Sequence, residues 1–136
     1  MTNKITIEQA KAEVLTFLEA HDLETDTSEM SAEDAQEFNE IVEAIAKPVS
    51  QGRAIIDDDK YTLTLRKAQG DLTSLTVQGM SASDMFAADK AKKNNDMAKT
   101  GQMIASMVGV PFAQVCKLTS QDFMLLSRMS GLFMAV

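Results

Sequence analysis

The segment over residues 53–78 constrains the fold most, because its apolar side chains repeat at every second position. In "YTLTLRK", which begins at Tyr61, tyrosine and two leucines alternate with threonine and arginine. This alternation places apolar side chains on one face of a β-strand, whereas a helix needs a period of about 3.6 residues. "RAII" before it and "LTSLTVQ" after it are further strand candidates, separated by the turn sequences "DDDK" and "AQGD". We therefore predict a small antiparallel β-meander, which needs helices against its apolar face.

Two amphipathic helices are predicted before this region. Thr6 and Gln9 have the spacing of a capping box, and the helix that they begin is expected to stop near His21. Ser31 is placed to cap the second helix, with acidic residues in the first turn, where the helix dipole favours them. Pro48 is expected to end this helix, because proline lacks the N–H that a helix interior requires.

The pattern after residue 80 is helical again, with several interruptions. Ser81 or Ser83 is the predicted N-cap, Gly109 and Pro111 predict a break, and Thr119 is a predicted cap of the last helix. The chain is thus predicted to be a mainly helical α+β protein. A single domain is expected over residues 1–136, with acidic helices in 1–47, the sheet in 53–78 and a methionine-rich helical part in 81–136. The predicted core residues are Leu63, Leu65, Ile104, Val108, Phe123 and Leu126.

Acidic residues are concentrated in the first part of the chain and methionines in the last part. Residues 1–60 contain 15 acidic and 5 basic side chains, whereas residues 61–136 contain 5 acidic and 8 basic ones. Eight of the ten methionines lie from Met80 onward. The net charge of −7 argues against a phosphate-backbone binder. No stretch has the roughly 18 apolar residues of a membrane helix, and residues 1–14 show no signal-peptide pattern.

The residues that could act in catalysis or bind a metal are more simply interpreted as structural or solvent-exposed. His21 is expected to interact with a helix end or with solvent, and Cys116, the single cysteine, is expected to be a buried structural thiol. Three consecutive aspartates, residues 57–59, are interpreted as a solvated turn, because calcium loops space their ligands at alternate positions. We predict no catalytic residue, no metal site and no cofactor, and therefore no enzymatic activity.

The methionines and two basic residues are the candidate binding residues. Methionine at helical spacing commonly belongs to a core, yet its flexible side chain also suits surfaces that accept varied apolar partners. Both interpretations, core and partner-binding groove, remain open. The candidate partner-binding residues are Arg66, Lys67, Met97, Met103, Met107, Met124 and Met129.

A family resemblance extends over residues 44–133. The stretch "AIAKPVSQGRAIIDDDKYTLTLRKAQGDLTSLTVQG" contains a proline, a glycine turn, a strand that ends in Leu-Arg-Lys at residues 65–67, and a Gly-Asp-Leu step at 70–72. Residues 104–111 then match a small helix broken by glycine and proline. Leu118, Asp122 and Leu126 match a closing "L…D…L" helix. This order of motifs resembles the tail assembly chaperones of Mu-like and related temperate, contractile-tailed phages.

The resemblance implies a phage or prophage tail assembly chaperone. Such proteins coat the tape measure protein and keep it soluble while the tail tube forms, and they are absent from the mature virion. It implies a host-cytoplasmic protein that self-associates into higher oligomers and binds neither nucleic acid nor membrane. Arg66 and Lys67 would be available to an acidic partner or a neighbouring subunit. The alternatives are a small acidic cytosolic adaptor or secretion-type chaperone that binds an amphipathic segment, and an acidic DNA mimic.

Overall fold

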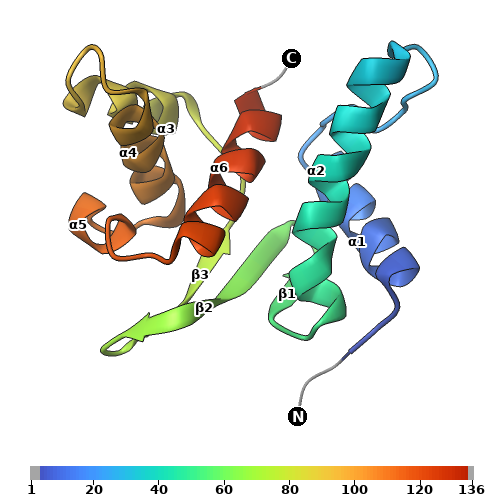
Figure 1. Ribbon diagram of the computed structural model, residues 1–136, viewed down its shortest axis with the longest axis horizontal. Coiled ribbons are helices and arrows are strands. Elements are labelled where there is room, and N and C mark those ends of the chain that lie inside the picture. The colour runs from blue at the N-terminus through green and yellow to red at the C-terminus, as the bar shows by residue number, and fades with distance from the viewer. Residues whose placement is uncertain (1–3, 135–136) are drawn as a thin grey trace. The chain divides into compact units, whose positions relative to one another are not determined.

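The computed structural model describes residues 4–134, whose helices and strands are labelled in Figure 1. The three strands form one antiparallel sheet in the order β1-β2-β3, and the mainly helical α+β prediction is confirmed. In chain order the elements are α1 (Ile7–Ala20), α2 (Ala32–Ser50), β1 (Ala54–Asp57), β2 (Lys60–Gln69), β3 (Leu72–Val77), α3 (Ala82–Phe86), the 3-10 helix η1 (Ala87–Lys90), α4 (Asp96–Val108), α5 (Phe112–Val115) and α6 (Ser120–Met134).

The chain divides into two compact units, with the division inside β2 between Leu63 and Thr64. The sequence predicted a single domain along the whole chain. The first unit contains α1, α2 and the β1–β2 hairpin, and the second contains the end of β2 and all elements that follow.

In the first unit, α1 and α2 pack against each other, and both contact β1. The phenol of Tyr61 is fully buried and donates a hydrogen bond of 2.8 Å to the backbone carbonyl of Ile45. The ring of Phe17 lies 5.9 Å from that of Tyr61, measured between centroids. Strand β2 is thereby attached to both helices through one side chain, in agreement with the inward position of Tyr61 in the alternating pattern.

The predicted caps are confirmed. The backbone N–H of Gln9 donates to the Thr6 hydroxyl and the Thr6 N–H donates to the Gln9 side chain, both at 3.1 Å. The Ser31 hydroxyl accepts the N–H of Asp34 at 3.0 Å. His21 is the C-cap residue of α1, and its Nε2 lies 2.7 Å from the carbonyl oxygen of Asp59. The Thr6 and Ser31 caps satisfy backbone N–H groups that a helix start leaves without an intrahelical partner. The His21 ring instead contacts the turn between β1 and β2, rather than the helix end or solvent that the sequence suggested.

The prediction that Pro48 ends α2 is wrong, because the helix continues to Ser50 with Pro48 inside its last turn. The chain turns away from the helix at Gly52, two residues after Ser50, with a φ of +78°. The N–H of Gly52 donates to the carbonyl of Val49 at 3.1 Å, and the N–H of Arg53 donates to that of Pro48 at 2.8 Å. This pair of bonds is a Schellman motif, which needs a residue in the left-handed conformation and therefore favours glycine.

The β-meander agrees with the sequence pattern. Strands β1 and β2 pair with Ala54 opposite Leu63 and Asp57 opposite Lys60. Gly70 occupies the β2–β3 turn with a φ of +61°, as the "AQGD" turn requires. The alternation of buried and exposed residues in β2 and β3 follows the predicted faces.

In the second unit, α4 contacts α3, η1, α5, α6 and β3. Four of the six predicted core residues, Leu63, Leu65, Ile104 and Leu126, are buried. Val108 and Phe123 are only half-buried, so that part of the core prediction is wrong. Val108 is the last residue of α4, and Phe123 faces a groove.

Candidate functional site: an apolar groove between α4, α5 and α6

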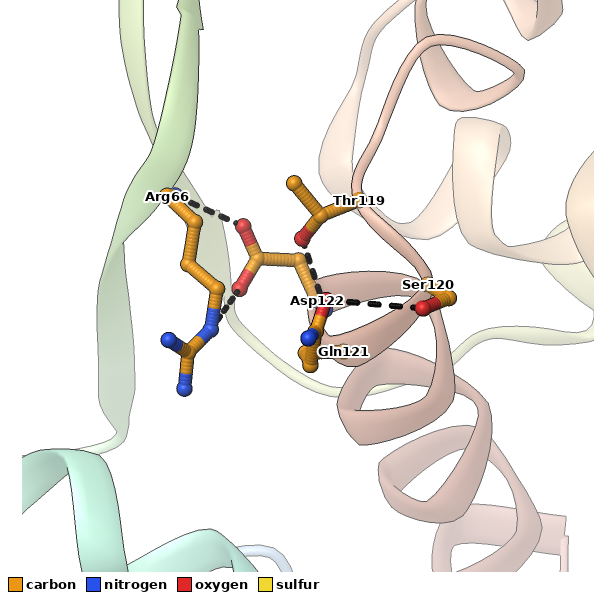
Figure 2. A network of polar contacts seen from close by, with 5 residues as sticks. All are labelled: Arg66, Thr119, Ser120, Gln121 and Asp122. Carbon is orange, nitrogen blue, oxygen red and sulfur yellow. Dashed lines mark hydrogen bonds and ion pairs between the residues drawn. The ribbon is translucent and has the colours of Figure 1, made fainter.

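The first turn of α6 is attached to β2 by a buried carboxylate. Thr119 caps this turn by accepting the N–H of Asp122 at 3.2 Å, which confirms its predicted role. The Asp122 side chain, 2 % exposed, accepts the backbone N–H of Arg66 at 2.8 Å. Its other oxygen lies 3.8 Å from Nε of the same arginine (Figure 2). Buried carboxylates require such partners, so this contact sets where α6 starts relative to β2.

The approach of α5 to α4 depends on two glycines. Gly109 has a φ of +74° and reverses the chain after α4. Phe112, the first residue of α5, then packs against Gly101 of α4, where an added Cβ would lie 2.8 Å from Cε1 of the phenylalanine ring. Only glycine at position 101 leaves room for this ring.

These contacts leave a groove between α4, α5 and α6, which we call the α4–α6 groove. It consists of two adjoining hollows of about 420 Å³ and about 230 Å³. Met97 and Phe123 line both hollows. Gly101, Phe112, Cys116 and Leu118 line the larger one, and Asp96 and Met124 line the smaller one. The lining is largely apolar, and the groove therefore suits an apolar partner surface rather than a catalytic reaction.

The candidate methionines separate into two groups. Met97 and Met124 are exposed, at 66 % and 46 % of their surface, and both line the groove. Met103, Met107 and Met129 are buried at 8 %, 8 % and 1 %. The first two side chains can reach a partner, whereas the other three belong to the packed interior.

The two basic candidates also differ in their surroundings. Arg66 is already engaged by Asp122, and Lys67 is exposed. Phe112, Leu118 and Phe123 were not among the residues predicted to bind a partner, yet they line the groove. The spacing of Gly101 and Phe112 around the Gly109 turn was the available signal, because a helical glycine often marks a close approach.

The expectation that Cys116 is buried is wrong, because its side chain is exposed and lines the larger hollow. Helix α5 has a single turn and buries Val115. Successive residues on a helix project about 100° apart, so the next side chain points away from that core. Cys116 is the single cysteine of the chain and provides a chemical handle inside the groove.

Four lysines lie close in sequence to residues that line the groove. Lys117 follows the lining residue Cys116 directly, and Lys92 and Lys93 lie shortly before α4. Lys99 lies within α4, and its Nζ is 3.9 Å from the carboxylate of Asp96, the acid that lines the smaller hollow. These four lysines outnumber Asp96, the acid among the described lining residues, which favours a cationic margin of the groove.

A second carboxylate connects α3 to α4 outside the groove. The Asp84 carboxylate accepts hydrogen bonds from the Ser106 hydroxyl and from the backbone N–H of Ser81. Burial acts to raise the pKa of Asp84, but these hydrogen bonds outweigh it and hold the pKa below its ordinary value of 3.8.

The described residues contain neither a candidate metal site nor a helix that could cross a membrane. Among residues 4–134, no group of three His, Cys, Asp or Glu side chains is arranged to hold a metal ion. Over the same residues, the helices are too short or too polar to cross a membrane.

A known protein family matches the second half of the chain. The family described as "Phage tail assembly chaperone proteins, E, or 41 or 14" matches residues 61–134, more than half of the chain. The chain belongs to this family. The match covers the Arg66–Asp122 contact and the whole α4–α6 groove, whereas α1 and α2 lie before it. No curated protein and no solved structure matches the chain significantly.

Proposed function

We propose that this phage tail assembly chaperone binds the tape measure protein in the α4–α6 groove and keeps it soluble during tail tube assembly. The observation that carries the proposal is the exposure of Met97 and Met124 on a groove inside the segment that matches the family. Flexible thioether side chains can pack on apolar stripes of varied shape, as a long helical client offers.

The acidic first unit has a different proposed role. Residues 1–60, which include α1 and α2, carry 15 of the 20 acidic residues of the chain and lie outside the family match. Their like charge would keep coated complexes apart and in solution. Several copies would cover one client, by self-association into higher oligomers in the host cytoplasm, and none would remain in the virion.

The experiment is co-expression of the chain with the tape measure protein encoded in the same phage or prophage. We expect the two proteins to co-purify. Met97→Asp and Met124→Asp should each abolish this, because a carboxylate placed in an apolar groove loses hydration without gaining a partner.

Met85→Asp is the matched control. Met85 is 45 % exposed, lies in the same unit on α3, and does not line the groove. The proposal would be contradicted if Met85→Asp also abolished co-purification. It would also be contradicted if both groove variants still co-purified with the tape measure protein.

The size of the protein across a concentration series tests the self-association. A chaperone that coats a long client should form larger assemblies as the concentration rises. A secretion-type adaptor would instead remain a defined dimer, and this result would favour the alternative function.

A further inference from the structure

We propose that the α4–α6 groove accepts an acidic amphipathic helix, which inserts two apolar side chains one helical turn apart. This inference rests on the proposed function and specifies the chemistry of the bound segment.

The shape of the groove supports two neighbouring anchors. Its hollows of about 420 Å³ and 230 Å³ adjoin each other, with Met97 of α4 and Phe123 of α6 lining both. Side chains at positions i and i+4 of a helix have Cβ atoms about 5–6 Å apart, so adjoining hollows fit adjacent residues of one helical face. Amphipathic helices that lie in apolar grooves use this spacing.

The charge around the groove supports acidic flanks. Lys117 follows a residue that lines the larger hollow, and Lys99 lies between two lining residues of α4. Lys92 and Lys93 are exposed shortly before the same helix. Asp96 is the acid among the lining residues, and Lys99 pairs with it at 3.9 Å. An anionic helix is therefore attracted to the margin, and a cationic one is repelled.

The acidic helices of a second copy do not fit this description. The exposed large apolar side chains of residues 4–134 are Ile55, Met85, Phe86, Met97 and Met124, none of which lies on α1 or α2. Those helices bury their apolar faces against each other. The acidic helices of a second copy thus offer the charge without the anchors. Met85 and Phe86 are consecutive on α3, a helix of five residues, and so are not spaced one turn apart. We therefore assign the occupant to a helix of another protein.

The test uses three fluorescein-labelled helical peptides and the full chain. The first peptide carries two leucines four residues apart with glutamates on both sides, and the second has lysine at each glutamate position. The third keeps the composition of the first with the leucines two residues apart. By fluorescence anisotropy, we expect the glutamate peptide to bind at least about tenfold more tightly than either other peptide at low salt. Its advantage over the lysine peptide should shrink as salt is added.

Two variants locate the effect in the groove. The double variant Lys93→Glu/Lys117→Glu should reverse the preference and bind the lysine peptide better, a gain that structural damage would not produce. Attaching a bulky maleimide to Cys116 should abolish binding of the glutamate peptide. Cys116→Ser treated with the same reagent should bind normally.

Equal binding of the two charged peptides, or binding that survives the blocked Cys116, would overturn the inference. If the chain captured the tape measure protein in either case, the proposed function would still stand. If the chain bound the glutamate peptide but not the tape measure protein, the proposed function would fail instead. If blocking Cys116 dissociated oligomers of the chain while no peptide bound, the occupant would be a second copy and the inference would be wrong.

Discussion

The backbone N–H of Arg66 donates to the carboxylate of Asp122, at 2.8 Å and across 56 positions of sequence. Strand β1 pairs with β2 only as far as Leu63, so the side chain of α6 supplies an acceptor that no β1 residue provides at Arg66. The family resemblance included the Leu-Arg-Lys step and the aspartate of the closing helix as separate motifs. The structure shows that these two motifs contact each other through Arg66 and Asp122.

Asp122→Ala should destabilise the second unit by about 2–3 kcal/mol, because it removes a charge-assisted hydrogen bond and leaves a strand N–H without its acceptor. Asp122→Asn should have a smaller effect, since its amide oxygen can still accept from Arg66. Urea unfolding measures both. Asp89→Asn, at an exposed site on η1, is the control and should be neutral. An Asp122→Ala variant as stable as the parent would show that the contact contributes little.

Gly101→Ala should reduce stability by about 1 kcal/mol, because the clash with Phe112 exceeds the gain in helix propensity. It should also weaken client binding, since the displaced ring forms one wall of the groove. Gly131→Ala is the matched control on α6, where an added Cβ meets none of the described atoms within 4 Å. This variant should gain about 0.5–1 kcal/mol from helix propensity alone. Equal thermal shifts for the two variants would refute the steric argument.

Gly52→Ala should destabilise the first unit by about 1–2 kcal/mol, because alanine in the left-handed conformation is strained. Chemical denaturation followed by circular dichroism would show this. Gly109→Ala, in a comparable conformation at the end of α4, should lose a similar amount from the second unit. No loss in the Gly52 variant would mean that the Schellman motif does not end α2.

Ser106→Ala should raise the pKa of Asp84, because it removes one of the hydrogen bonds that favour the ionised carboxylate. The folded-state pKa lies below the ordinary value of 3.8, so the contribution of Asp84 to stability is present above about pH 4. It is lost as the pH falls through the lower folded-state pKa. Carboxyl-carbon NMR titration of the parent and the variant measures the shift. An identical Asp84 pKa in both proteins would contradict this account.

Local sequence was sufficient for the secondary structure, since the groups involved are only a few residues apart. The Thr6–Gln9 capping box, the Ser31 cap and the alternating strand from Tyr61 each follow from spacing and side-chain chemistry alone. Pro48 is the exception, and it shows where a prediction from local sequence fails. A proline costs a helix one hydrogen bond, and in the last turn of α2 the Schellman bonds at Gly52 decide the end instead.

Tertiary structure decided which side chains form the candidate site. Helical spacing shows which residues share a face, but it does not show which neighbouring element covers that face. Met103 and Met107 lie four residues apart on α4 and are buried. Met97 lies six residues before Met103, a rotation of roughly 240° around the helix axis, so it projects from a different face and is exposed. Cys116 is exposed because α5 is a single turn, and Phe123 faces a groove because the Asp122 contact with Arg66 determines where α6 begins. These outcomes depend on contacts between residues far apart in the chain, and no local pattern contains them.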